Sequence, residues 1–104
     1  MKIDAKGIGY SELNKMIRES SEEKFELENV LGQRYIGDGM SGKEILINGT
    51  PGNALGAYLN GSKIIVHGNA QDAIGDTMND GAIIVHGNCG DTTGYAMRSG
   101  EIYV

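Results

Sequence analysis

The stretch ILINGTPGNALGAYLNGSK (residues 45–63) is followed by IIVHGNAQDAIGDTMNDGA (64–82), by IIVHGNCGDTTGYAMRSGE (83–101) and by the start of a further copy, IYV (102–104). The copies repeat with a period of 19 residues and without a change of register. Self-similarity at about 20 residues predicts a solenoid, in which each repeat buries its apolar face against the next one. This repeat therefore decides the fold.

Within each copy, a β-branched triplet such as Ile64, Ile65 and Val66 is typical of a strand. The first and third side chains of the triplet would point to one side and the second to the other. A polar residue and a glycine follow and predict a corner, because positive φ is readily adopted only by glycine. The turn glycines predicted from this register are Gly49, Gly56, Gly68, Gly75, Gly87 and Gly94.

The remainder of each copy predicts two more short strands and two more turns. The second strand is expected near Leu55, Ile74 and Thr93. The inward side chains after it are expected to be Leu59, Met78 and Met97. Left-handed β-helices run on a hexapeptide period, and 19 is not a multiple of six, so the right-handed form fits better. We therefore predict a mainly β fold, a right-handed single-stranded parallel β-helix of 19-residue coils with an N-terminal helical cap.

Residues 1–44 precede the regular coils and are predicted to cap them. Lys2–Ala5 would form a short strand, and a helix is expected over about residues 11–19, with Ser11 as its N-cap. Such a short helix is marginal alone, so it would cover the first coil. The apolar side chains spaced for one face of this helix are Leu13, Met16 and Ile17.

The segment before Ile45 is a degenerate copy of the repeat. A half-buried strand is expected from Phe25 to Glu28, and Gly37 lies 19 residues before Gly56. Val30 stands where later copies have glycine, so this first coil should have a different corner. We assign residues 1–44 to the cap with its first coil, and residues 45–104 to β-helix repeats that stop in mid-coil.

Composition and charge favour a cytoplasmic protein. A single cysteine, Cys89, excludes a disulfide within the chain and is typical of a reducing compartment. We expect no signal peptide and no membrane span, because the sequence contains no long apolar run. A net charge of −5 argues against a nucleic-acid partner. The coils carry so few charged side chains that we expect a protein partner to cover part of them.

Stacking in register turns each repeat position into a column of side chains. His67 would lie over His86, with Asn48 in the coil before. Two imidazoles about 5 Å apart could hold a metal, and a free-standing metal- or ligand-binding protein could use them together with Asp72 or Asp91. No cysteine or carboxylate shares the histidine column, however, so we favour an outward polar ladder.

Two more columns have a functional and a structural interpretation. Asn53, Asp72 and Asp91 could suggest calcium, but the calcium-binding nonapeptide pattern is absent, so a solvated turn ladder is predicted. Cys89 has no adjacent base and is interpreted as a structural thiol, since a nucleophile needs an activating partner. The other members of its column are Pro51 and Ala70.

The chain resembles the GXGXG domain found at the C-terminal end of the large subunit of glutamate synthase, which in some prokaryotes is a separate small protein. The matching strings are IDAKGIGYSELN (3–14), ENVLGQRYIGDGMSG (28–42), GTPGNALGAYLNG (49–61), GNAQDAIGDTMNDG (68–81) and GNCGDTTGYAMRSG (87–100). The resemblance covers nearly the whole chain. A more distant resemblance is to a subunit of formylmethanofuran dehydrogenase.

The resemblance implies a β-helix that is not itself catalytic and that braces a glutamine amidotransferase against an FMN and iron–sulfur synthase, across which ammonia is channelled. No catalytic residue of the family can be transferred to this chain. The amidotransferase nucleophile is an N-terminal cysteine, whereas residue 1 is Met1, and an iron–sulfur cluster needs several cysteines. FMN and the cluster are therefore expected on partner subunits. The alternative is a scaffold subunit of a formylmethanofuran dehydrogenase-like complex.

Members of the family usually continue with further coils, whereas this chain stops in the middle of a strand. An uncapped coil presents unpaired backbone groups and the side chains of Ile102, Tyr103 and Val104 to a neighbour. We expect this edge to bind subunits of the same complex, or a second copy of the chain when it is isolated, as a homo-oligomer.

Overall fold

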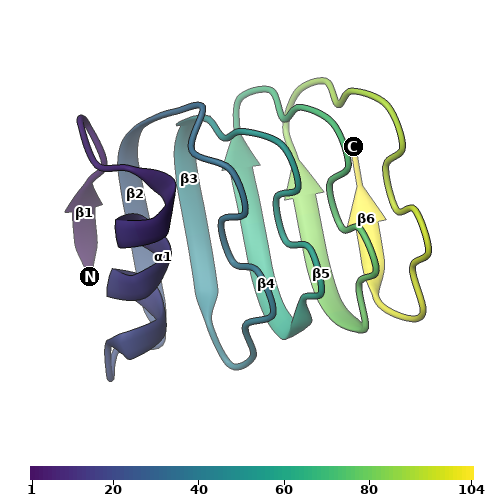
Figure 1. The fold of residues 1–104 in the computed structure, drawn as a ribbon, viewed down its shortest axis with the longest axis horizontal. Coiled ribbons are helices and arrows are strands. Elements are labelled where there is room, and N and C mark those ends of the chain that lie inside the picture. The colour runs from purple at the N-terminus through teal and green to yellow at the C-terminus, as the bar shows by residue number, and fades with distance from the viewer.

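The structure, a computed structural model, describes residues 1–104 and contains one six-stranded parallel sheet and one helix (Figure 1). The strands lie side by side in sequence order, from β1 to β6. The elements are β1 (Lys2–Asp4), α1 (Tyr10–Glu19), β2 (Lys24–Leu31), β3 (Glu44–Thr50), β4 (Asn60–His67), β5 (Asp80–Val85) and β6 (Glu101–Tyr103). No helix is long and apolar enough to cross a membrane.

The strand pairing confirms the predicted register of the coils. Ile45 in β3 aligns with Ile64 in β4, which aligns with Ile83 in β5, and Ile47 aligns with Val66. In Figure 1 the strands rise behind the connections, which descend in front while the chain advances from left to right. The coils therefore wind in the right-handed sense, and the fold is the predicted parallel β-solenoid.

The interior of the solenoid is filled by aliphatic side chains at alternate strand positions. In β4, Ile64 and Val66 are fully buried, whereas Ile65 between them is half-buried on the outer face. Leu55 and Ile74 reach the same core from the opposite side of the coils. Each fully buried side chain of this kind contributes roughly 1.5–3 kcal/mol, and it does so only because the neighbouring coil covers it.

The second strand predicted in each coil is not formed, and two consecutive turns replace it. In residues 54–59, the N–H of Ala57 donates to the Ala54 carbonyl (3.1 Å) and the N–H of Leu59 donates to the Gly56 carbonyl (3.0 Å). The prediction was wrong because Leu55, Ala57 and Leu59 are buried at every second position, which is also the period of a strand. The same correction applies at Ile74 and Thr93.

Helix α1 covers the first coil as predicted, but its start differs from the prediction. Gly9 is the N-cap residue and no side chain caps the helix, so Ser11 lies inside the first turn. Leu13 and Ile17 are fully buried, whereas Met16 is 37% exposed and does not belong to the packed face. The buried face is narrower than the apolar spacing suggested, because a polar side chain occupies part of it.

That polar side chain is Asn14, which bonds α1 to the far side of the first coil. Its Nδ2 donates to the Arg34 carbonyl (3.4 Å), and its Oδ1 accepts the backbone N–H of Gly37 (3.0 Å). The Arg18 guanidinium adds a bond of 2.7 Å to the Asp38 carbonyl. The N-terminal end of the solenoid is thus closed by hydrogen bonds as well as by apolar packing.

The first coil has the different corner that Val30 predicted. β2 pairs Leu27 with Ile47 but Val30 with Gly49, so its register shifts at a β-bulge. Asn29 lies within the bulge and adopts a left-handed conformation, with φ of 58°. Bulges bend the strand that carries them, which lets the atypical first coil join the regular ones.

Candidate functional site

Each coil contains three left-handed residues at alternate positions on the side opposite the sheet. In the second coil they are Ala54, Gly56 and Tyr58, with φ of 60°, 65° and 57°. We call the full set the left-handed turn ladder; its other members are Tyr35, Gly37, Gly39, Ala73, Gly75, Thr77, Thr92, Gly94 and Ala96. The middle position is glycine in every coil. Most flanking positions carry other residues, at a cost of about 1 kcal/mol each.

The left-handed turn ladder links neighbouring coils by backbone hydrogen bonds in both directions. The N–H of Ala54 donates to the Asp72 carbonyl in the next coil (2.9 Å), and the N–H of Gly56 donates to the Ile36 carbonyl in the previous coil (2.8 Å). The N–H of Gly75 repeats the second of these bonds, to Leu55 (2.8 Å). A segment without strands therefore still satisfies its backbone groups.

The central glycine of each turn pair leaves room for an isoleucine from the sheet. A Cβ on Gly56 would lie 2.6 Å from Cδ1 of Ile83, and a Cβ on Gly37 would lie 2.7 Å from Cδ1 of Ile64. These separations are shorter than carbon atoms tolerate, so both space and φ require glycine here. The glycine column and the isoleucine column form one packing unit across the core.

The glycines at the corners after the strands are required for a related but different reason. Gly49 and Gly68 have φ of 136° and 150°, whereas Gly87 does not have a positive φ, contrary to the prediction. At Gly68 and Gly87, an added Cβ would collide with the backbone carbonyl of the glycine one coil earlier, and at Gly49 with that of Val30. The close stacking of corners, rather than φ alone, therefore explains this column.

His67 and His86 lie together at the end of the outer sheet face. Their ring centroids are 5.3 Å apart in an edge-to-face arrangement, and both side chains are exposed. Asn48, which pairs with His67, donates its side-chain amide to Oε1 of Glu28 (3.1 Å). No group of three or more histidine, cysteine, aspartate or glutamate side chains is placed to hold a metal. The pair thus offers a metal two imidazoles and no third ligand of these types.

The aspartates considered with these histidines belong to another ladder. Oδ1 of Asn53 accepts the N–H of Asp72 (3.0 Å), and Oδ1 of Asp72 accepts the N–H of Asp91 (2.8 Å). Asn69 makes the same bond to Asn88 at 2.9 Å. All of these side chains are exposed. This is the predicted solvated turn ladder, whose side-chain oxygens bond the backbone of the next coil.

Cys89 has the surroundings of a structural thiol. It is free, half-buried and packed against the core. Pro51 and Ala70, its predicted column neighbours, are buried. Burial raises the pKa of the Cys89 thiol, which keeps it protonated near neutral pH and lowers its reactivity.

The predicted association edge lies at β6. This strand pairs with β5 on one side only. Ile102 is half-buried, whereas Tyr103 and Val104 are 55% and 66% exposed. The Tyr103 hydroxyl donates to Oε2 of Glu101 (2.9 Å), and this bond raises the pKa of Tyr103. Association through these three residues stays a prediction.

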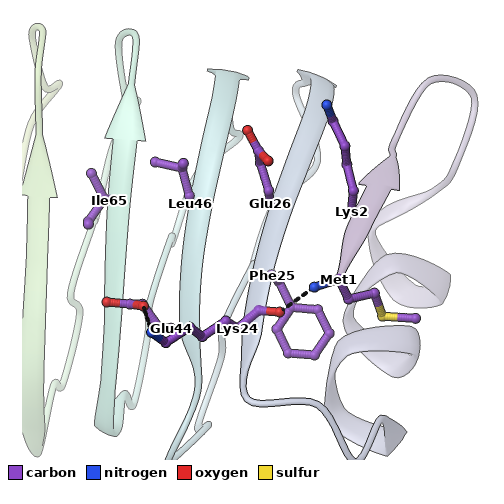
Figure 2. A pocket seen from close by; sticks show the side chains of 8 residues that line it. All are labelled: Met1, Lys2, Lys24, Phe25, Glu26, Glu44, Leu46 and Ile65. Carbon is purple, nitrogen blue, oxygen red and sulfur yellow. Dashed lines mark hydrogen bonds and ion pairs between the residues drawn. The ribbon is translucent and has the colours of Figure 1, made fainter.

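The outer face of the sheet carries an apolar row that was not predicted as a site. Figure 2 shows two rows of side chains on this face. They line a shallow hollow with a volume of about 400 Å³. Leu46 and Ile65 lie in one row with Glu26 and Lys2. The sequence contained a sign of this row, because the middle residues of the β-branched triplets are aliphatic, where a solvated face would carry polar side chains.

Comparisons with known proteins connect this fold to a family. The family model described as GXGXG motif matches residues 17–104. An uncharacterized protein of Methanocaldococcus jannaschii is 48% identical over 63 residues, and this match covers 54% of the present chain and 24% of that relative. The match therefore spans about a quarter of the relative's length. No solved structure matches the chain.

Proposed function

Because the chain belongs to the GXGXG motif family, the domain found in the large subunit of glutamate synthase, we propose that it is a non-catalytic structural subunit of a glutamate synthase-type complex. It would brace a glutamine amidotransferase subunit against a synthase subunit that carries FMN and an iron–sulfur cluster. The family match over residues 17–104 is the observation that carries this proposal. We place the complex in the cytoplasm, in keeping with the single free thiol.

The distribution of reactive groups supports a bracing role. Cys89 is half-buried with a raised pKa, and the side chain of Asp72 bonds the next coil. His67 and His86 contact each other but have no carboxylate or thiol beside them that would complete a ligand set. A nucleophile or a general base would instead need an activating partner within hydrogen-bond reach.

We assign the partner contacts to the side of the left-handed turn ladder and to the edge of β6. Tyr58 and Tyr95 stand 55% and 67% exposed on the turn side. Exposed tyrosines are enriched in protein interfaces because they combine a large apolar ring with a polar group.

Affinity purification of the tagged chain from its native cell extract tests the proposal. Co-purification of a glutamine amidotransferase and of a flavin and iron–sulfur synthase subunit, identified by mass spectrometry, is the expected result. Tyr95→Ala should reduce their recovery, whereas Leu31→Ala, which truncates a side chain that is 81% exposed at another corner, should not. Recovery of molybdenum or tungsten enzyme subunits would favour the formylmethanofuran dehydrogenase-like alternative. Recovery of the chain alone would contradict both.

A further inference from the structure

The outer face of the sheet is suited to contact with a second protein surface. We define the outer apolar row as the side chains that strand pairing places next to one another on β3–β6: Leu46, Ile65, Ile84 and Tyr103. At the usual strand spacing this row is ~14 Å long. A sheet face in contact with water usually carries polar side chains, whereas this row is aliphatic apart from Tyr103. The coils cover the inner face here, and no element of the chain covers the outer one (Figures 1 and 2).

A row of charged residues runs beside the outer apolar row. We define the charged row as the side chains aligned on β2–β6: Lys24, Glu44, Lys63, Ala82 and Glu101. The sign alternates from β2 to β4, Ala82 on β5 is uncharged, and Glu101 on β6 is acidic. The Lys24 and Glu44 side chains are 3.9 Å apart. A face with both signs in one row can match a copy of itself, whereas a face of one sign would repel its copy.

We propose that two copies of the chain pack outer face against outer face, around a two-fold axis that runs parallel to the strands between β3 and β4. This symmetry places each row over its own counterpart and exchanges β3 with β4. Glu44 of each copy then faces Lys63 of the other, and Leu46 of each faces Ile65 of the other. Each contact occurs twice, as in every isologous interface.

The charged row and the extent of overlap together select this axis among its alternatives. An axis along β4 would place Lys63 over Lys63 of the second copy. An axis between β4 and β5 would place Glu44 over Glu101 of the second copy, and an axis along β3 would oppose the two Glu44 carboxylates. Like charges held directly opposite one another at an interface are destabilising. An axis along β5 would also place Lys63 over Glu101 of the second copy around an apolar centre, but it would overlap only β4–β6. The axis between β3 and β4 gives opposite charges and an apolar centre and overlaps all six strands.

The remaining pairs are mixed. Glu26 lies over Ile84 and Lys24 over Ala82 of the second copy, which weakens the contact, whereas two pairs at the edges of the face are favourable. Lys2 lies over Tyr103 of the second copy, where an ammonium can contact an aromatic face. Glu28 lies over His86 of the second copy, a carboxylate against an imidazole that can donate a hydrogen bond. Sheets packed face to face lie ~10 Å apart, a distance that these long side chains can span.

The size of the face predicts a weak dimer. Six strands with five spacings of ~4.8 Å, and about five residues per strand, give a footprint well below the ~800 Å² per partner of a standard stable interface. The dimer should therefore dissociate at micromolar concentrations and form at higher ones. It is closed, because both copies use the same surface, so assembly stops at two.

Sedimentation equilibrium of the full chain over about 1–500 μM tests the dimer. We expect the mean mass to rise from one chain toward two and no further. Ile65→Glu should stay monomeric and should retain a cooperative thermal unfolding transition at a slightly lower temperature, because this side chain is only half-buried. Met16→Glu is the matched control, since it places the same charge on an exposed apolar position of α1, and it should dimerise like the unmodified chain.

Charge reversal tests the position of the axis. Lys63→Glu should raise the dissociation constant about tenfold or more, because it opposes Glu44 of the second copy twice. The double variant Glu44→Lys with Lys63→Glu should restore dimerisation. Failure of this restoration would overturn the proposed axis.

Two further results would overturn the dimer itself. One is a chain that remains monomeric at the highest concentration. The other is association that persists in the Ile65→Glu variant. If that association were then lost in the Ile102→Lys variant, the contact would lie at the β6 edge instead. This inference does not rest on the proposed bracing role, since the purified chain alone is measured.

Discussion

The two long sides of the solenoid share one 19-residue period but are built in different ways. The sheet side pairs extended strands, and its β-branched residues are suited to that conformation. The opposite side, the left-handed turn ladder, holds seven non-glycine residues at positive φ and still bonds both neighbouring coils. Stacking in register thus requires a fixed coil length and a complete set of hydrogen bonds, but it does not require strands.

The comparison also shows where the chain tolerates substitution. On the turn side, glycine occurs in every coil only at the central position, where an isoleucine of the sheet fills the space, as Ile83 does beside Gly56. The flanking positions accept Ala54 and Tyr58 in spite of their strain. At the corners after the strands, glycine recurs because the backbones of successive coils nearly touch. A backbone atom in contact with a new Cβ can move less than the end of a side chain, so a substitution at a corner glycine should be more destabilising than one at a central glycine.

Gly68→Ala should have the largest effect. Its φ is 150°, and an added Cβ would collide with the Gly49 backbone carbonyl, which cannot move without displacing a coil. We expect a loss of about 4 kcal/mol in the free energy of unfolding, measured by denaturant titration. Gly61→Ala is the matched control, because its φ of 108° is also positive but the nearest atom to an added Cβ is 3.8 Å away. Equal losses in the two variants would show that strain alone matters.

Gly56→Ala should have an intermediate effect of roughly 2–3 kcal/mol, the sum of left-handed strain and overpacking. The atom in the way is Cδ1 of Ile83, at the flexible end of a side chain, so part of the clash can relax. Gly32→Ala has a similar φ of 79° with open space around it, and it should lose only about 1 kcal/mol. If Gly56→Ala were as costly as Gly68→Ala, the distinction between side-chain and backbone contacts would be wrong.

Thr77→Gly should be stabilising by about 0.5 kcal/mol. A β-branched residue is strained at φ of 52°, and relief of that strain slightly exceeds the entropy that glycine loses on folding. Ala73→Gly, at φ of 59°, should change the unfolding free energy by about 0 kcal/mol, because alanine is less strained there. Differential scanning calorimetry of both variants measures this difference, and a clear loss in Thr77→Gly would contradict it.

The Cys89 thiol should give the smallest effect, visible only in the pH dependence of stability. Because burial raises its folded-state pKa above the ordinary 9.0, the unfolded chain loses the thiol proton first as pH rises. Stability therefore falls above that ordinary value until the folded thiol ionises as well. Melting temperatures measured from about pH 7 to about pH 10 should decline less in Cys89→Ala. Identical pH profiles would show that the thiol is not desolvated.

The sheet side could be predicted from the sequence because its signals are local and repeated. β-branched triplets at a fixed period define both the strands and their register, so Ile45, Ile64 and Ile83 align as expected. The turn side could not be predicted in the same way, because burial of every second residue is expected both for a strand and for consecutive left-handed turns. Only a glycine in the centre of each copy, such as Gly56, distinguished them, and it was interpreted as a single corner.

The N-terminal cap shows a different limit of sequence interpretation. Ser11 has the chemistry of an N-cap, yet the helix begins one residue before it, at Tyr10. Asn14 is polar and would be placed on a solvated face, but its amide meets the turn side of the first coil. Such contacts depend on the position of residues about 20 further along the chain, and the local sequence pattern around Asn14 does not predict that position.

Glutamate synthesis in extracts of cells with and without this chain tests the proposed role as a non-catalytic brace most directly. If the chain joins an amidotransferase to a synthase, its loss should abolish glutamine-dependent synthesis while glutamine hydrolysis and ammonia-dependent synthesis each persist. Addition of the purified chain should restore the coupled reaction. Loss of either separate reaction would show that the chain takes part in the chemistry, and unchanged glutamine-dependent synthesis would show that it belongs to another assembly.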